Sequence, residues 1–173
     1  SYVIWAQNGG NSNLYMAQVD PAKPWKTITP AMLLTKPEYD WEKIRIPVNE
    51  GPSVLFHDGK VIVAYSASAT GPEYCVGLMY ADTSSDLLDV NSWKKLDYAL
   101  LTSDDLADEY GPGHNSFVKN EDGEWMFVYH SRDKECFEKR CKYHDNDPLY
   151  DPCRSARIRK VQFSEDGILI LNR

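Results

Sequence analysis

Three things are scarce in this sequence of 173 residues: positive charge, long apolar runs and helical periodicity. The formal net charge is −7, and nucleic acids are bound through basic patches, so we expect no nucleic-acid partner. No apolar run approaches the ~18 residues that a membrane-spanning helix needs, so we expect no membrane partner either. The acidic balance favours a neutral or cationic small substrate.

Aromatic residues, in contrast, are plentiful, with five Trp and eleven Tyr. Such a composition is expected of β-structure or of a surface that stacks on ring-shaped ligands. The length suits one domain, residues 1–173, with a sizeable core. The sequence starts at "SYVIWAQ", inside an expected strand and without a polar leader, so we expect it to be cut from a longer protein.

The four cysteines divide into one isolated residue and one group. Cys75 lies in the alternating run "EYCVGLMYA" and is expected to be a small buried core residue. Cys136, Cys141 and Cys153 share one polar loop, where a disulfide would suit a secreted protein. Free thiols, or a zinc site that adds His144, are the alternatives, although the full spacing matches no standard zinc pattern.

Short alternating or apolar runs bounded by turn residues recur along the whole chain and predict β-strands. Asp58-Gly59 and Asp122-Gly123 each separate two such runs, and Asp-Gly between strands predicts a hairpin. The expected strands are "YVIWAQ", "NLYMAQV", "SVLFHDGKVIVAYSAS" (two), "YCVGLMYAD", "WKKLDYALLT", "NSFVKNEDGEWMFVYHSR" (two), "SARIRKVQF" and "ILIL".

These strands form a repeat with a period of about sixty residues. Tyr65 ends the second strand of one unit and Tyr129 ends that of the next, sixty-four positions later, while Trp5 holds the equivalent place in an earlier unit. Four-stranded units at a fixed spacing indicate the blades of a β-propeller, whereas an immunoglobulin-like sandwich does not repeat its hairpin in this way. We therefore predict an all-β fold with about three blades of an expected five-bladed ring. The segment 37–49 is expected to link two blades.

Two Gly-Pro pairs stand at what look like corresponding places, in "WEKIRIPVNEGP" and "DEYGPGHNSF", each in a loop ahead of the first strand of a unit. The first strand of a propeller blade lines the central channel. Glu50 and His114 are therefore expected to meet at one cavity, although they lie more than sixty residues apart in the sequence.

Glu50 is the candidate catalytic residue. Desolvation beside aromatic walls favours the neutral form of a carboxylic acid, which can then protonate a leaving oxygen. The alternative is that Glu50 caps a turn or pairs with a Lys.

Four further positions are candidates for ligand contact, each with a structural alternative. His114 follows Gly113 and could ligate a cation or hydrogen-bond a sugar hydroxyl, or else join neighbouring blades. Trp5, together with Trp41 and Tyr65, could stack on a ligand or belong to the core. Arg154 could clamp a hydroxyl or carboxylate, or be a solvated loop residue.

The sequence also resembles a known family, glycoside hydrolase family 43, in its arabinofuranosidase/β-xylosidase-like members. The likeness covers nearly the whole chain and corresponds to the C-terminal part of the catalytic domain. The ordered motifs that carry it are "VNEGP", "YSASAT", "YCVGLM", "SWKK", "YGPGHNSF", "VYHSR" and "YDPCRSAR".

The resemblance implies a five-bladed propeller that hydrolyses arabinosyl or xylosyl linkages with inversion. It implies that Glu50 is the general acid, that His114 lines the channel and serves a structural calcium ion, and that Arg154 contacts the sugar. Cys153 stands where the family pattern has Asn. The family's base Asp and pKa-tuning Asp would both precede Ser1, so the resemblance implies that this chain alone is inactive.

Two hypotheses follow. The first is a piece of an extracytoplasmic glycosidase acting on arabinose- or xylose-containing saccharides. The second is a propeller that binds carbohydrate without catalysis. Open blade edges would in either case invite self-association.

Overall fold

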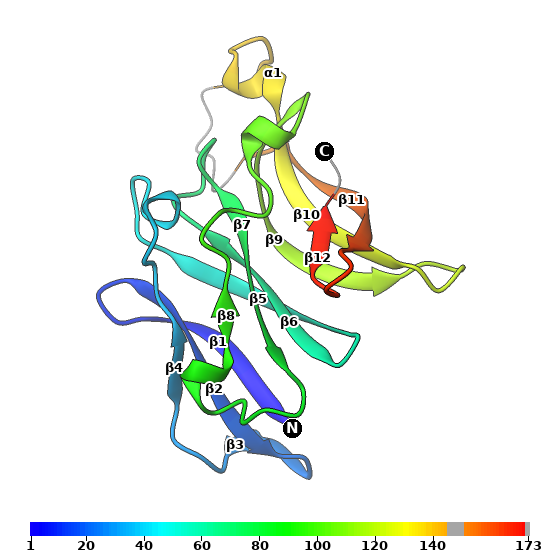
Figure 1. The fold of residues 1–173 in the computed structure, drawn as a ribbon. Coiled ribbons are helices and arrows are strands. Elements are labelled where there is room, and N and C mark those ends of the chain that lie inside the picture. The colour runs from blue at the N-terminus through cyan, green and yellow to red at the C-terminus, as the bar shows by residue number, and fades with distance from the viewer. Residues whose placement is uncertain (145–150, 172–173) are drawn as a thin grey trace.

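In the computed structural model, which describes residues 1–144 and 151–171, the chain forms three four-stranded antiparallel sheets. They follow one another around the molecule in chain order (Figure 1). The first sheet has the order β1-β2-β3, and β4 also pairs with β2. Its strands are β1 (Tyr2–Asn8), β2 (Ser12–Asp20), β3 (Lys23–Thr27) and β4 (Met32–Thr35).

The other two sheets are simple meanders, β5-β6-β7-β8 and β12-β11-β10-β9. The strands of the middle sheet are β5 (Asn49–His57), β6 (Lys60–Ala67), β7 (Cys75–Asp82) and β8 (Lys94–Lys95). Those of the third sheet are β9 (Glu109–Lys119), β10 (Trp125–Asp133), β11 (Arg154–Phe163) and β12 (Leu169–Leu171).

Helical structure in the described residues is limited to short connections. The 3₁₀ turns are η1 (Asp40–Glu42), η2 (Val90–Ser92) and η3 (Ser103–Asp105), and the single α-helical turn is α1 (Lys134–Phe137). As predicted, the segment 37–49 links two sheets, and η1 lies within it. None of these helices has the length and apolar character that a membrane-spanning helix requires.

Both predicted hairpins are present. β5 and β6 turn at Asp58 and Gly59, whose φ angles of 45° and 69° are those of a type I′ turn. β9 and β10 turn around Gly123, which also has a positive φ, 78°. Such turns match the twist of the paired strands, which explains why Asp-Gly marked them in the sequence.

The core consists of two apolar clusters, one on each face of the middle sheet. Side chains alternate between the faces of a strand, so successive residues of β6 enter different clusters. Ile62 packs with Phe127 and Leu169 of the third sheet, whereas Val63 packs with Leu14 and Met16 of the first sheet. Cys75 is buried in the second cluster, as predicted.

One strand prediction was too long. Of "WKKLDYALLT", only Lys94–Lys95 pairs with β7, and Leu101 adds an isolated bridge. The Lys95 ammonium is held by the buried Glu42 carboxylate, and the indole N–H of Trp41 donates to the carbonyl of Asp97. Beyond Lys95 the segment keeps only separate backbone hydrogen bonds to β7, such as those from Leu96 N–H to Leu78 and from Leu100 N–H to Val76.

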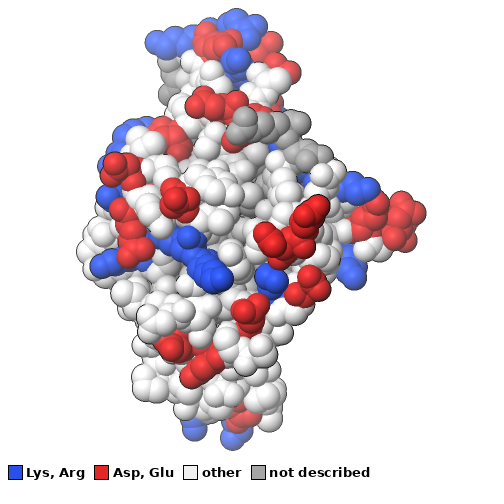
Figure 2. Space-filling view, viewed as in Figure 1, with Lys and Arg blue, Asp and Glu red and all other residues white. Residues whose placement is uncertain are grey.

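The surface carries both signs of charge. On the face in Figure 2, acidic and basic side chains are interspersed, and the described residues on it form no continuous basic surface.

Candidate functional site

Glu50 lies inside a strand, which corrects the prediction of a loop ahead of it. In the ladder, Glu50 pairs with Ser66 and Ser53 pairs with Ala64, so three steps of β5 match two of β6. The extra residue makes a β-bulge at Gly51-Pro52, where Gly51 has φ 56° and Pro52 needs no ladder partner. A bulge changes the direction in which side chains point, and here it directs the half-buried Glu50 toward Tyr74.

His114 lies in the matching bulge of the next sheet. Gly113 pairs with His130 and Ser116 with Val128, again three steps against two, and His114 has φ 50°. A positive φ is unusual for a residue with a side chain, and such strain clusters at functional sites. The backbone N–H of His114 donates to Ser66 Oγ at 2.6 Å, which ties the two sheets together.

The register corrects the correspondence drawn between the two Gly-Pro pairs. Glu50 is equivalent to Gly113, and Gly51 is equivalent to His114, while Gly111-Pro112 belongs to a second bulge of β9. The two equivalent bulges face each other, because a Cβ added at Gly51 would lie 3.2 Å from His114 Nδ1. The expectation that Glu50 and His114 lie close together therefore agrees with the structure, by a different alignment.

Tyr74 joins these two residues. The Tyr74 hydroxyl donates to Glu50 Oε1 at 2.6 Å. The hydroxyl oxygen of Tyr74 also lies 3.4 Å from His114 Nδ1. The ring is buried in the space that Gly113 leaves, since a Cβ there would lie 2.2 Å from Tyr74 Cε1. Burial, followed by the charge and hydrogen bond of Glu50, raises the pKa of Tyr74 far above its usual value. Tyr74 therefore keeps its proton and remains a hydrogen-bond donor.

His130 forms the next layer of the site. Its ring stacks on Tyr74 with centroids 5.7 Å apart and lies 6.2 Å from the His114 ring. Burial, and then the electrostatic influence of Arg154 and His114, lowers the pKa of His130 to about 4. At neutral pH this imidazole is therefore uncharged.

Arg154, at the start of β11, lies on the same side of the Glu50 network as His130. It lines a small cavity with His130, Arg132 and Phe137, and its charge acts on both Tyr74 and His130. Arg154 is thus close to the Glu50 network, with its guanidinium as the source of positive charge there.

The predicted aromatic positions behave differently from one another. Trp5 is half-buried in β1, stacks on Tyr15 at 6.0 Å and donates its indole N–H to Gln7, so its contact with a ligand stays a prediction. Tyr65 is fully buried in the core, and Trp41 packs beside it at 6.5 Å. The core alternative is therefore confirmed for Tyr65.

A buried carboxylate supports the strand that carries Glu50. Glu42 is fully buried and accepts hydrogen bonds from Asn49 Nδ2, Tyr65 Oη and Lys95 Nζ at 2.8 to 3.0 Å. Asn49 directly precedes Glu50, so this network holds the start of β5 in place. A paired and fully hydrogen-bonded charge is the form in which burial is tolerated.

The sequence interpretation missed Tyr74, His130, Ser66 and Glu42. A usable signal existed for His130 and Ser66, which follow the repeat markers Tyr129 and Tyr65 at the ends of second strands. For Tyr74 and Glu42 the signal is weaker, because both lie in connections ahead of a strand. Their partners, Glu50 for Tyr74 and Asn49 for Glu42, are set by the fold.

His114 was also the candidate metal ligand. Calcium takes six to eight oxygen ligands, whereas His114 offers nitrogen. In the described part of the chain, the one group of three His, Cys, Asp or Glu side chains close enough to share an ion is Cys136, Cys141 and Cys153. A calcium ion at His114 therefore stays a prediction, and we derive no step through a metal.

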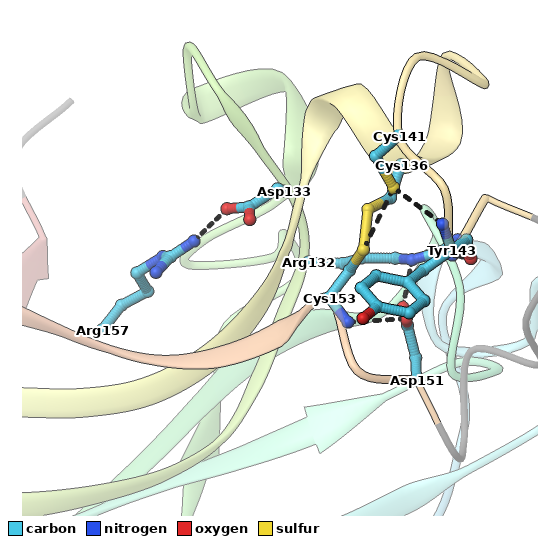
Figure 3. Close-up of a disulfide and its surroundings, with 8 residues drawn as sticks. All are labelled: Arg132, Asp133, Cys136, Cys141, Tyr143, Asp151, Cys153 and Arg157. Atoms are coloured by element: carbon cyan, nitrogen blue, oxygen red, sulfur yellow. Dashed lines mark hydrogen bonds and ion pairs between the residues drawn. A yellow bond between two sulfur atoms is a disulfide. The ribbon is translucent and has the colours of Figure 1, made fainter.

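Of the three alternatives for the cysteine loop, the structure has the disulfide, between Cys136 and Cys153, with Cys141 as a thiol beside it (Figure 3). It joins α1 to the start of β11. A closed loop of this length stabilises the folded state by about 3 kcal/mol in the chain-entropy model. Next to it, Arg132 forms a buried ion pair with Asp151.

Comparison with known proteins places this geometry in a family. The sequence matches the family described as "Glycosyl hydrolases family 43" over residues 1–169. It is 38% identical over 174 residues to alpha-L-arabinofuranosidase 43 of Humicola insolens. It is 39% identical over 173 residues to an extracellular exo-alpha-(1->5)-L-arabinofuranosidase of Streptomyces avermitilis. Both alignments cover 96% of this chain and 34% of the relative, so the chain spans about a third of the length of these curated relatives.

Solved structures give the fold. An alpha-L-arabinofuranosidase from Lactobacillus brevis superposes with a TM-score of 0.85 at 40% identity, over 99% of this chain and 51% of that one. A thermostable family-43 glycoside hydrolase superposes with a TM-score of 0.75 at 26% identity, over 99% of this chain and 53% of that one. The predicted β-propeller fold is confirmed. The chain belongs to glycosyl hydrolase family 43, and its three sheets form part of a five-bladed β-propeller.

Proposed function

We propose that this chain supplies the general acid of an inverting glycosidase that cleaves α-L-arabinofuranosyl linkages in plant poly- or oligosaccharides. The observation that carries the proposal is Glu50 on its bulge, bound by the protonated Tyr74 and flanked by His114. Relatives at 35 to 41% identity bear the name arabinofuranosidase, whereas a xylosidase in the comparison is 19% identical. We therefore favour arabinosyl over xylosyl substrates.

In this proposal Glu50 donates a proton to the leaving oxygen, and Tyr74 orients its carboxyl group. Arg154, beside His130, contacts the sugar, and Trp5 offers a stacking face. An inverting enzyme also needs a second carboxyl group about 6.5–9.5 Å from the acid, to activate water. The hydrogen-bond partner of Glu50 in the described residues is Tyr74, and we assign the base to none of them, so we expect this chain alone to be inactive.

The test is hydrolysis of 4-nitrophenyl α-L-arabinofuranoside and β-D-xyloside by the chain and by Glu50→Gln. We expect no turnover above buffer for either protein. Turnover by the chain that Glu50→Gln abolishes would show that a base lies within it and would overturn the inactivity claim. A longer form of the protein that cleaves neither substrate would overturn the glycosidase proposal.

The second candidate function is carbohydrate binding without catalysis, favoured by the aromatic residues and by Arg154 beside the site. Calorimetric titration with arabinose and an arabino-oligosaccharide separates the two. Binding that Arg154→Ala weakens, together with a longer protein that retains binding but lacks turnover, would support the binder.

Three further parts of the proposal concern the location of the protein, its self-association and a bound calcium ion. We propose an extracytoplasmic location, supported by the disulfide and by relatives named extracellular. We propose self-association through the edge strand β1, which size-exclusion chromatography with light scattering would detect. We also keep a calcium ion near His114 as a proposal, and a chelator that leaves the melting temperature unchanged would oppose it.

A further inference from the structure

The three loop cysteines form a compact group outside the Glu50 network. Their sulfur atoms all lie within 4.8 Å of one another, with Cys136 and Cys153 buried and Cys141 half-buried. The sulfur of Cys141 lies 3.3 Å from that of Cys153, although Cys153 is already bonded to Cys136 (Figure 3). A thiol thus contacts a disulfide sulfur directly.

We propose that these cysteines form a thiol–disulfide exchange unit in which Cys141 replaces Cys136 as the partner of Cys153. Cys141 loses its proton to solvent, and its thiolate attacks Cys153 Sγ. The Cys141–Cys153 bond forms as the Cys136–Cys153 bond breaks, and Cys136 leaves as a thiolate that takes up a proton. No net oxidation or reduction occurs, so no external oxidant is needed.

The surroundings of Cys141 suit the attacking role. The backbone N–H of Tyr143 donates to Cys141 Sγ at 3.3 Å and holds this sulfur beside Cys153 Sγ. Arg132, buried beside the group, donates to the carbonyl of Tyr143 and so holds that turn in place. Cys153 is fixed as the target, because its N–H donates to Asp151 Oδ1.

The exchange changes what is tethered beside the candidate site. Cys136 precedes Phe137, and Cys153 precedes Arg154, and both of these neighbours line the small cavity that contains His130. In the first state α1 is bonded to the start of β11, whereas in the second state the turn carrying Cys141 is bonded there and α1 is released. Phe137 would then keep its place through the Arg132 guanidinium, 4.3 Å from its ring, and through Tyr110.

The test is a time course of thiol labelling in the native wild-type chain. The protein is incubated with iodoacetamide at pH 7.5 and at pH 8.5, quenched with acid and digested with trypsin. Lys139 and Lys142 separate the three cysteines into different peptides for mass spectrometry. Alkylated Cys141 can no longer attack Cys153, so iodoacetamide is kept limiting and the two labels mark different molecules. We expect an early phase of label on Cys141 and a second phase of label on Cys136, in molecules that exchanged before alkylation and that yield a Cys141–Cys153 linked peptide. The second phase should be several-fold faster at pH 8.5, since exchange follows the thiolate fraction.

Variants sharpen the test. In a glutathione redox buffer, Cys136→Ser should form the Cys141–Cys153 disulfide, whereas Cys141→Ser should show no second phase of labelling. Cys75→Ser, which alters a buried cysteine in the core, is the matched control and should behave as wild type. Label confined to Cys141 after overnight incubation of the wild type would overturn the proposal. The same holds if Cys141 and Cys153 both stay reduced in Cys136→Ser. The wild-type time course requires no variant to fold.

Discussion

At the scale of single residues, the site depends on groups whose protonation is fixed by their surroundings. The raised pKa of Tyr74 keeps its proton in place near neutral pH, so its hydroxyl donates to Glu50 there. His130 stays uncharged near neutral pH, because burial and the neighbouring Arg154 lower its pKa. The hydrogen-bond direction between Tyr74 and Glu50 is therefore constant across the physiological range.

The depressed pKa of His130 predicts a pH dependence of stability. Its folded-state pKa of about 4 lies below the unfolded value of about 6.5, so the contribution is complete above pH 6.5 and is lost as pH falls through 4. Between pH 7 and pH 4.5, wild type should lose about 1–2 kcal/mol more unfolding free energy than His130→Gln, after allowance for solvent screening of a half-exposed ring. Urea unfolding followed by tryptophan fluorescence measures the difference. Equal losses in the two proteins would contradict it.

At the scale of elements, paired bulges in β5 and β9 build the site. Each inserts one residue with positive φ, Gly51 in one strand and His114 in the other, and thereby aims side chains toward the neighbouring sheet. Gly113, at the position equivalent to Glu50, carries no side chain, and the Tyr74 ring occupies that space.

This packing predicts that Gly113→Ala is damaging. The added methyl would overlap the Tyr74 ring and push it away from Glu50 and His130, at a cost of about 1–3 kcal/mol for overpacking. Thermal unfolding by circular dichroism should show a clear loss, whereas Gly9→Ala, whose new Cβ meets only side-chain atoms at 3.3 Å or more, should stay near wild type.

A double mutant with Tyr74→Ala is the control for the effect of Gly113→Ala. If the methyl group acts through the ring, Gly113→Ala should be less harmful in a Tyr74→Ala background, because the two changes share one space. Strictly additive losses would show that the damage arises elsewhere.

The same elements show what the sequence could predict. Asp-Gly turns, alternation and the sixty-four-residue repeat were local or periodic signals, and they predicted the hairpins and the propeller. The Gly-Pro pairs were misaligned, because a bulge shifts the ladder by one residue and such a shift is set by pairing partners rather than by local sequence. Tyr74 was missed for a related reason: its role depends on the absence of a side chain at Gly113, which lies 39 positions later in the sequence.

At the scale of the whole molecule, the middle sheet unites two cores. β6 is its most buried strand, and Ile62 and Val63, both fully buried, face opposite clusters shared with the third and first sheets. The first and third sheets therefore depend on the same strand, and through it on the same Glu42 network that positions Glu50.

This arrangement predicts that a cavity on either face weakens all three sheets together. Ile62→Ala should lower the unfolding free energy by about 2–5 kcal/mol, and Val63→Ala by about 2 kcal/mol. Hydrogen exchange measured by mass spectrometry should report the loss in both β2 and β10, because loosening β6 removes the support that each cluster shares. If Ile62→Ala speeds exchange in β10 and leaves β2 unchanged, the blades unfold independently and the shared-core interpretation is wrong. Similar losses of exchange protection in β2 and β10, with one unfolding transition, would mean that neighbouring blades help to hold the bulge that carries Glu50. The pairing of β5 with β6 would then not be its only support.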